Sequence, residues 1–180
     1  MLNWLYGRHL PLWLGAIVHI VGVSVVHAAI PWALSLLAAR HGWEAGAPGS
    51  WNLVGLIPVA AGLFIIVWSV RAHFTASPEG WRLEKTPHYP TPAYLLSRGP
   101  YKYSRNPIYL AEGTIWLGWM LFYGSFAVLG VFALGSLLLG PIVVRREERG
   151  LEARFGDVYR EYARNTPRWL GKAKAPPISS

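Results

Sequence analysis

Four apolar stretches decide what this chain of 180 residues can fold into. They cover residues 10–39, 51–70, 108–122 and 126–144. A helix that crosses the hydrocarbon core of a bilayer needs about 20 apolar residues. Pro31 interrupts the first stretch, which therefore forms either one kinked helix or two segments. We predict an all-α integral membrane protein with four transmembrane helices, or five if the first stretch is divided.

The composition supports a location in a membrane. Hydrophobic residues make up 53% of the chain and charged residues 14%, whereas a soluble domain has about 25% charged residues. The net charge of +8 could indicate nucleic acid, but the basic residues flank apolar stretches, where anionic lipid head groups are the better partner. We therefore expect a lipid bilayer as partner, and no nucleic acid. The absence of cysteine excludes disulfides, cysteine-ligated zinc and a thiol nucleophile, and we expect no metal site.

Basic residues are distributed unevenly between the loops. Residues 71–105 contain six lysines and arginines and residues 145–174 contain nine, whereas residues 40–50 contain one and the turn at 123–125 contains none. Loops rich in lysine and arginine stay on the cytoplasmic side of a membrane. The sequence therefore predicts that both termini and the basic loops are cytoplasmic. The first apolar stretch exceeds the roughly 7–15 residues of a signal peptide, so we expect it to be retained.

The stretches and loops divide a single domain into five parts. These are the N-terminal spans, a proline-rich cytoplasmic loop, a helical hairpin, a C-terminal segment and a tail expected to be disordered, at residues 1–72, 73–107, 108–144, 145–170 and 171–180. In the C-terminal segment, apolar residues recur at spacings of three and four between Arg146 and Tyr162, which predicts an amphipathic helix. Gly156 weakens this helix and Pro167 ends it.

A basic and aromatic segment leads into the third apolar stretch, at residues 99–109. Asn106 and Pro107 predict a helix start, because Asn is a good N-cap and Pro is favoured at the first helical position. The free N–H groups of that helix start favour a carboxylate or a phosphate. Glu112 follows just inside the helix, and two interpretations of it are open. It pairs with Arg105 or Lys102, or it contacts a ligand.

A second polar cluster ends the fourth apolar stretch, at residues 145–148. Taken alone, its two arginines and two glutamates would anchor a helix end at the membrane surface. The short turn between the last two stretches brings this cluster back beside the first one. Such a site suits a zwitterion with a cationic centre, because glutamate binds an ammonium, arginine binds a carboxylate, and an aromatic ring attracts a sulfonium.

Together the two clusters resemble a superfamily of membrane methyltransferases, which includes isoprenylcysteine carboxyl methyltransferases and phospholipid N-methyltransferases. The shared pattern is Gly-x-Tyr, Arg-His/Asn-Pro-x-Tyr, an apolar hairpin, and Glu-Glu-x-x-Leu-x-x-x-Phe-Gly-x-x-Tyr-x-x-Tyr, at residues 99–162. The resemblance implies S-adenosylmethionine as cofactor and a lipophilic acceptor in the membrane, such as a lipid amine, a carboxylate or a thiol. It also implies that the C-terminal amphipathic helix covers a cofactor pocket on the cytoplasmic side.

The resemblance assigns roles to individual residues. It implies that the cofactor is bound by Tyr101, Arg105, Asn106, Pro107, Tyr109, Gly113, Glu147 and Glu148. The residues expected to take part in catalysis are Glu112, Arg105 and Arg146.

Two departures from the pattern count against a prenylcysteine substrate. Asn106 stands where prenylcysteine enzymes have histidine, and Asn cannot act as a base. Those enzymes also have an arginine near the place of Val143 or Val144. An amine or thiol acceptor would be helped by a base, and the candidates are Glu112, Glu148 and His73. The first stretch contributes His19 and His27, for which interhelical hydrogen bonds are a simpler explanation than a metal.

Two other functions remain open at this point. One is an NADPH-dependent membrane reductase of the sterol or steroid type, which needs a larger basic pocket for phosphates. The other is a non-catalytic membrane protein that uses the same fold. The methyl acceptor and the oligomeric state are not indicated by the sequence.

Overall fold

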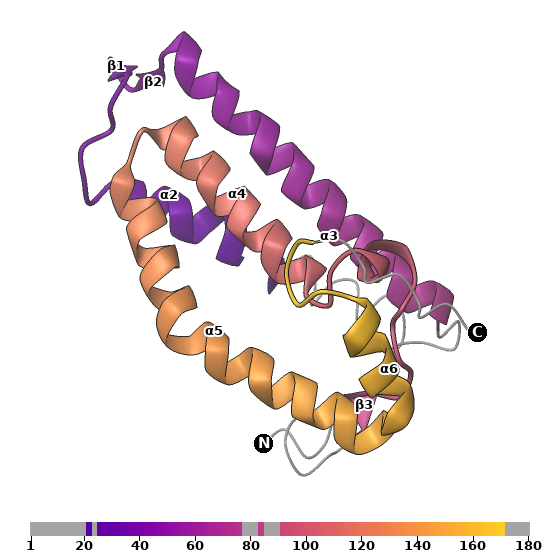
Figure 1. The fold of residues 1–180 in the computed structure, drawn as a ribbon. Coiled ribbons are helices and arrows are strands. Elements are labelled where there is room, and N and C mark those ends of the chain that lie inside the picture. The colour runs from indigo at the N-terminus through magenta and orange to yellow at the C-terminus, as the bar shows by residue number, and fades with distance from the viewer. Residues whose placement is uncertain (1–20, 23–24, 77–82, 85–90, 172–180) are drawn as a thin grey trace. The chain divides into compact units, whose positions relative to one another are not determined.

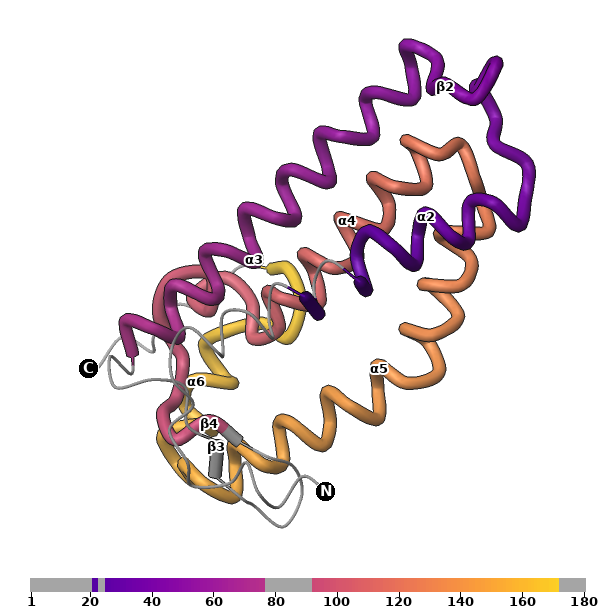
Figure 2. Tube along the Cα trace, turned by 180° about the vertical axis from the view of Figure 1, so that it is seen from behind, coloured from indigo at the N-terminus to yellow at the C-terminus, as the bar shows by residue number. Residues whose placement is uncertain are grey.

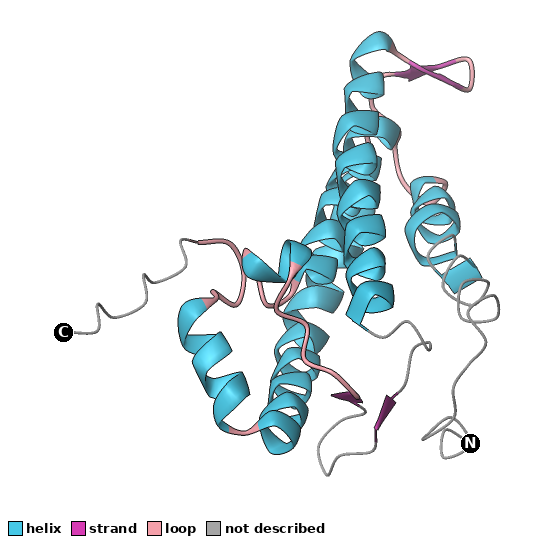
Figure 3. Cartoon of the chain, turned by 90° about the vertical axis from the view of Figure 1, so that its right-hand side faces the viewer, coloured by secondary structure: helices cyan, strands magenta, loops and turns pink. Residues whose placement is uncertain are grey.

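A computed structural model describes residues 21–22, 25–76, 83–84 and 91–171. Helices make up most of the described chain, and the strands are two short antiparallel pairs (Figures 1 and 3). The helices are η2 (Val25–Ala29), α2 (Ile30–Ser35), η3 (Ser50–Gly55), α3 (Leu56–Ala76), η4 (Gly99–Lys102), α4 (Pro107–Tyr123), α5 (Phe126–Phe155) and α6 (Asp157–Asn165). The strand pairs are β1 (Trp43–Glu44) with β2 (Ala47–Pro48) and β3 (Leu83–Glu84) with β4 (Thr91–Pro92).

The described chain forms two compact units. The first joins residues 67–107 to residues 141–171, and the second joins residues 21–66 to residues 108–140. The first unit contains the ends of α3 and α5, the loop that precedes α4, and α6. The second contains α2, most of α4 and the beginnings of α3 and α5.

Among the described residues, two helices are long and apolar enough to cross a membrane, Ser50–Ala76 and Phe126–Phe155. Their large side chains face outward, as Phe64 at 66% and Leu137 at 74% exposure illustrate. An apolar exterior of this kind favours lipid over water. The predicted helical fold is confirmed, with two candidate membrane spans among the described residues, and membrane insertion itself stays a prediction. Because α4 has only 17 residues and residues 10–20 lie outside the described chain, the count of four or five spans stays a prediction.

In the second unit, α3 and α4 pack closely through small residues. A Cβ atom added at Gly55 would meet the backbone of Gly118, and one added at Gly62 would meet the backbone of Ala111. Glycine at such positions lets helix backbones approach each other, which is a common contact between membrane helices. Ile115 is fully buried. The pair α3–α4 is therefore a firm support for the side chains that α4 presents on its other faces.

The predicted tight turn between the third and fourth stretches is confirmed. Helix α4 ends at Tyr123 and α5 begins at Phe126, so only Gly124 and Ser125 connect them. Gly124 has a φ of +58°, a conformation that glycine adopts without strain. Buried Asn52 donates from Nδ2 to the carbonyl oxygens of His41 and Leu121, each at 3.1 Å. These bonds hold residues 41–52, which contain the unpredicted strands β1 and β2, against the turn.

The predicted amphipathic helix from Arg146 to Tyr162 is confirmed only in part, because its residues are helical but divided between two helices. Helix α5 continues through Pro141 and the arginine pair as far as Phe155. A proline inside a helix removes one backbone donor but does not force the helix to stop. The break comes instead at Gly156, whose φ of +53° lies outside the helical region. Helix α6 then runs to Asn165, two residues before Pro167.

The loop predicted at residues 73–107 begins later and is partly regular. Helix α3 extends to Ala76, so His73 lies on a helix. Strands β3 and β4 and helix η4 follow before α4 begins at Pro107, as predicted. The expectations for His19 and for the tail from residue 172 onward concern residues outside the described part of the chain.

Candidate functional site

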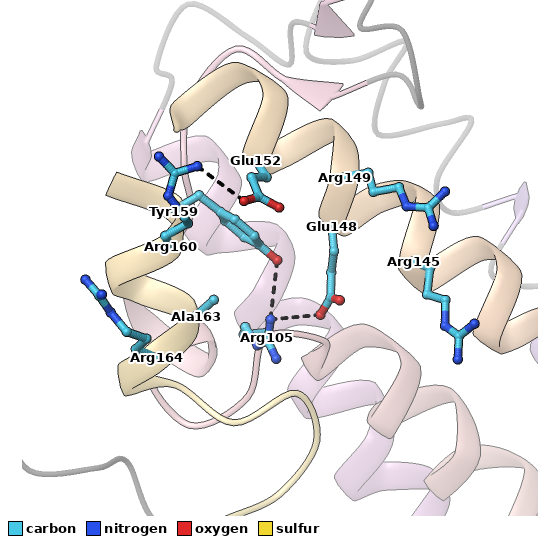
Figure 4. Close-up of a pocket in the computed structure, with 9 residues that line it drawn as sticks. All are labelled: Arg105, Arg145, Glu148, Arg149, Glu152, Tyr159, Arg160, Ala163 and Arg164. Carbon is cyan, nitrogen blue, oxygen red and sulfur yellow. Dashed lines mark hydrogen bonds and ion pairs between the residues drawn. The ribbon is translucent and has the colours of Figure 1, made fainter. Parts of the chain in front are cut away.

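Three segments of the first unit meet around the guanidinium group of Arg105 (Figure 4). Its Nη1 lies 2.9 Å from Oε1 of Glu148 on α5 and donates to the hydroxyl of Tyr159 on α6 at 3.4 Å. The side chains of Arg105 and Glu148 are only 16% and 15% exposed. The break at Gly156 allows this arrangement, because it turns α6 back so that Tyr159 and Glu148 approach the same arginine.

Glu148 is also bound by a second arginine, from the segment that follows α6. The Nε and Nη2 atoms of Arg168 lie 3.0 Å and 2.6 Å from its two carboxylate oxygens. Such a bidentate pair is among the strongest contacts that a carboxylate makes. Hydrogen bonds to Glu148 raise the pKa of Arg168 above its ordinary value.

The backbone of this C-terminal segment is fastened to the loop before α4. Asn106 donates from Nδ2 to the carbonyl oxygen of Arg168 at 2.9 Å, and Ser104 donates from Oγ to the same oxygen at 3.2 Å. The backbone N–H of Arg105 donates to the carbonyl oxygen of Pro167 at 2.9 Å. Asn106 and Ser104 are both buried. We call residues 166–168 the strap, because they tie the end of the described chain to Arg105 and Asn106.

A group of tyrosines surrounds His73 at the other side of the loop. The hydroxyl of Tyr94 lies 3.2 Å from Nδ1 of His73, and that of Tyr101 lies 3.3 Å from Nε2. Tyr162 on α6 donates to the carbonyl oxygen of Tyr101 at 2.8 Å. Figure 2 shows α6 beside the loop that carries Tyr101. Since both ring nitrogens of His73 face tyrosine hydroxyls, His73 is engaged in structure and is a weak candidate for the base.

Burial changes the acidity of these tyrosines. It raises the pKa of Tyr94 to about 12. It also raises the pKa of Tyr101, with smaller contributions from the charges of Glu147 and Tyr94. All these hydroxyls keep their protons near neutral pH and serve as neutral hydrogen-bonding groups.

A cavity of about 420 Å³ opens beside Arg105, within the range of about 300–1,000 Å³ that is usual for small-molecule sites. It is lined by Arg105, Arg145, Glu148, Arg149, Glu152, Tyr159, Arg160, Ala163 and Arg164 (Figure 4). Arg160 pairs with Glu152 at 3.3 Å. The other arginines of the lining, apart from Arg105, have no carboxylate partner among the described residues. The cavity is therefore positively charged.

One polar atom in this site lacks a partner. The Nε atom of Arg105 is buried and makes no hydrogen bond among the described residues. A buried donor without a partner is costly, and an anionic ligand in the cavity would supply the missing acceptor. The charge of the lining and this unsatisfied donor both suit a ligand that carries a carboxylate or a phosphate.

The structure brings several of the predicted site residues together in the first unit, namely Tyr101, Arg105, Asn106, Pro107, Glu147 and Glu148. Arg146 belongs to the same unit, but it is exposed and does not line the cavity, whereas its neighbour Arg145 does. Whether these residues bind a cofactor stays a prediction.

Three other predicted residues, Tyr109, Glu112 and Gly113, belong to the second unit. There Oε1 of Glu112 lies 3.7 Å from Nε2 of His27. Glu112 therefore pairs with a histidine of the first apolar stretch, rather than with Arg105 or Lys102. The expected interhelical hydrogen bond of His27 is present, because Trp116 donates from Nε1 to its Nδ1 at 3.2 Å.

Sequence reasoning missed several residues of the cavity and the strap. Tyr159 belongs to the quoted pattern but was given no role, and neither were the arginines at 149, 160, 164 and 168. Their spacing carries no signal of a site if one continuous helix is assumed. The positive φ of Gly156 is what brings α6 and its arginines to Glu148, and the Phe-Gly pair of the pattern was the available clue.

Comparisons with known proteins agree with the resemblance. The family model described as phospholipid methyltransferase matches residues 51–158, which is more than half of the chain. The chain therefore belongs to the phospholipid methyltransferase family. It is similar to the cobalt-zinc-cadmium resistance protein CzcN of Cupriavidus metallidurans, with 41% identity over 75 residues, or 41% of this chain and 33% of that protein.

A second relative is an uncharacterized protein of Haemophilus influenzae, with 42% identity over 64 residues, or 35% of this chain and 100% of that protein. The matched part of this chain spans about a third of the length of CzcN. No solved structure matches the chain.

Proposed function

We propose that this protein is an S-adenosylmethionine-dependent methyltransferase that acts on a lipophilic acceptor in the membrane. The observation that carries the proposal is the partly buried carboxylate of Glu148, held by two arginines beside a positively charged cavity. Membership of the phospholipid methyltransferase family supports the reaction class. The apolar exterior of α3 and α5 supports an acceptor that reaches the protein from lipid.

The residues of the first unit fit the charges of this cofactor. Glu147 and Glu148 can bind its ammonium group, and Arg105, with its unsatisfied Nε, can bind its carboxylate. Tyr159 offers an aromatic ring beside them for the sulfonium or the adenine of the cofactor. When bound, the cofactor supplies an electrophilic methyl group on a positively charged sulfur. The part of the protein is then to align donor and acceptor, which is worth about 7–11 kcal/mol in favourable cases.

We expect the cofactor to share or rearrange the ion pairs at Glu148. Its Oε1 atom contacts Arg105 and Arg168, and its Oε2 atom contacts Arg168. A carboxylate accepts about four hydrogen bonds, so an ammonium can bind beside the two guanidinium groups or take the place of one of them. If it takes the place of Arg105, that side chain can turn to the carboxylate of the same ligand, and the number of charge-assisted bonds is conserved.

The first test is calorimetric titration of the detergent-purified protein with S-adenosylhomocysteine. We expect binding to the wild type and a loss of at least about tenfold in affinity for Glu148→Gln, because a hydrogen bond to a charged group contributes about 1.5–3 kcal/mol. Glu161→Gln is the matched control, since Glu161 lies exposed on α6 and outside the cavity. Equal affinity of Glu148→Gln and wild type would remove Glu148 from the cofactor site.

A second candidate function is favoured by one observation. The cavity contains more arginines than carboxylates, and Arg145, Arg149 and Arg164 have no carboxylate partner among the described residues. Such a lining also suits the phosphates of NADPH, as a membrane reductase would require. Parallel titration with NADPH separates the two. Binding of NADPH without binding of S-adenosylhomocysteine would replace the proposed methyltransferase by a reductase.

A further inference from the structure

The second unit contains an ionisable pair between two of its helices, η2 and α4. His27 lies in the π-helix η2 and is only 6% exposed, whereas its apolar neighbours Val25 and Val26 are 48% and 42% exposed. The segment thus turns its one polar side chain inward and its apolar side chains outward. Ionisable residues within membrane helices are rare and usually functional, and single-turn π-helices often occur at functional sites.

Two tryptophans of α4 fix the position and the protonation of His27. Trp116 donates from Nε1 to Nδ1 at 3.2 Å, and Trp119 donates from Nε1 to the backbone carbonyl oxygen of His27. An indole nitrogen is a donor only. Nδ1 must therefore be the unprotonated nitrogen, and the imidazole carries its proton on Nε2.

This tautomer directs an N–H group toward Glu112. The distance from Nε2 to Oε1 is 3.7 Å, too long for a direct hydrogen bond but within the range of an ion pair. The side chain of Glu112 is 29% exposed, so it can be reached from outside the pair. A small protic group placed beside both atoms could accept a hydrogen bond from Nε2 and donate one to Glu112. The two residues thus offer one hydrogen-bond donor and one acceptor to a third group.

We propose that His27 and Glu112 bind the X–H group of the methyl acceptor, and that this acceptor is an amine, a thiol or an alcohol rather than a carboxylate. A carboxylate would be repelled by Glu112 and has no proton to donate to it.

The proton balance of the reaction follows from this placement, and the inference rests on the proposed methyltransferase function. If the acceptor is methylated while this pair holds it, Glu112 would take the proton of the X–H group, and the electron pair of that bond would stay on X and form the new bond to the methyl group. The electrons of the methyl–sulfur bond would remain on the sulfur of S-adenosylhomocysteine. The Nε2–H of His27 would contact a lone pair of X before the attack, and His27 would not itself change protonation.

The test uses binding rather than turnover, with the purified protein in lipid nanodiscs. Dodecylamine, dodecanethiol and dodecanoate serve as probes, because they share one apolar chain and differ in the terminal group. We expect the amine and the thiol to bind and dodecanoate to bind far more weakly. Glu112→Gln should lower the affinity for dodecylamine by about ten- to a hundredfold, while the affinity for S-adenosylhomocysteine stays unchanged.

Matched controls and a spectroscopic readout separate recognition from folding. Glu44→Gln makes the same change at an exposed site on β1 and should leave all affinities unchanged. The side-chain nitrogens of His27, observed by NMR, should show a proton on Nε2, and dodecylamine should shift that signal. Trp116→Phe should remove the preference for this tautomer. If Glu112→Gln does not fold, His27→Gln compared with the exposed His41→Gln gives the same test.

Three results would overturn the inference. Dodecanoate could bind as tightly as dodecylamine, Nε2 of His27 could be unprotonated, or Glu112→Gln could weaken S-adenosylhomocysteine together with the amine. The last result would place Glu112 in the cofactor pocket instead. Failure of the wild type to bind S-adenosylhomocysteine would instead reject the methyltransferase function, and the three probes would still report whether the pair prefers protic groups.

Discussion

At the scale of single residues, the surroundings of Glu148 decide which ligands can enter the first unit. Its carboxylate contacts Arg105 at 2.9 Å and Arg168 at 2.6 Å, and its side chain is 15% exposed. A largely desolvated carboxylate without a partner is strongly unfavourable, so a ligand that displaces an arginine must offer a positive group in its place. A purely anionic ligand is repelled by Glu148. A zwitterion can satisfy both the carboxylate and an arginine that it displaces.

The tyrosines beside His73 give a prediction for alkaline solution. Burial raises the pKa of Tyr94 from 10.0 to about 12. The unfolded chain therefore loses this proton near pH 10, whereas the folded chain keeps it until near pH 12. The contribution of Tyr94 to stability is complete below pH 10 and falls as the pH rises from there toward 12. We expect a less steep decline of melting temperature over this range in Tyr94→Phe.

Tyr103→Phe is the control for this measurement, because Tyr103 is 62% exposed. It should follow the wild-type decline. A Tyr94→Phe profile that coincides with the wild type over the same pH range would show that the burial of this hydroxyl does not affect its ionisation.

At the scale of elements, the break between α5 and α6 builds the site. Tyr159 and Arg160 follow the break, and Glu148 and Glu152 precede it. Arg160 contacts Glu152 at 3.3 Å, and Tyr159 and Glu148 share Arg105. A continuous helix would direct these side chains along a single axis, and they could not enclose a cavity. The conformation of Gly156 is therefore as important to the site as the charged residues.

This role of Gly156 can be tested with two alanine substitutions. Gly156 has a φ of +53°, and a Cβ atom added there meets nothing within 4 Å. Gly156→Ala therefore causes no steric clash, and its only cost is the strained backbone conformation of alanine at this φ. We expect it to lower the free energy of unfolding by about 1–2 kcal/mol. Gly135 also has open space around it but lies within α5, so Gly135→Ala should raise stability by about 0.5–1 kcal/mol. Thermal unfolding in detergent measures both. Equal shifts of the same sign would contradict the assigned role.

The elements show which parts of the structure the sequence could predict. Helices α3 and α4, the turn at 124–125 and the helix start at Pro107 follow from local patterns, and they were predicted close to where they lie. The continuation of α5 was missed, because Pro141 and the charges after it resemble a helix end. The contacts of the strap and of His27 join residues more than sixty positions apart. No local pattern contains such pairs. The resemblance could therefore predict which residues belong to the site, but not which of them contact each other.

At the scale of the whole molecule, apolar and basic side chains occupy different parts of the described chain. The outward residues of α3 and α5 are apolar along most of each helix. Arginines gather instead at residues 98–105 and 145–168. This separation is what sets the orientation of a membrane protein. We propose that the basic segments, and with them the cavity, face the cytoplasm.

The absence of native cysteine allows a direct test of this orientation. Ser97 and Ser50 are both exposed, the first in the basic loop and the second at the start of η3. In intact cells, a membrane-impermeant maleimide should label Ser50→Cys, and it should label Ser97→Cys only after lysis. The opposite pattern would reverse the proposed topology and place the cavity outside the cytoplasm.

The strap also determines when during synthesis the site can exist. Arg105 and Asn106 leave the ribosome about sixty residues before Pro167 and Arg168, whose carbonyl oxygens they bind. Synthesis at about 5–20 residues per second separates the two events by several seconds. During that interval both apolar hairpin helices can already enter the bilayer, while Glu148 still lacks Arg168. A nascent chain can therefore insert before residues 166–168 are available to bind Glu148, Ser104 and Asn106.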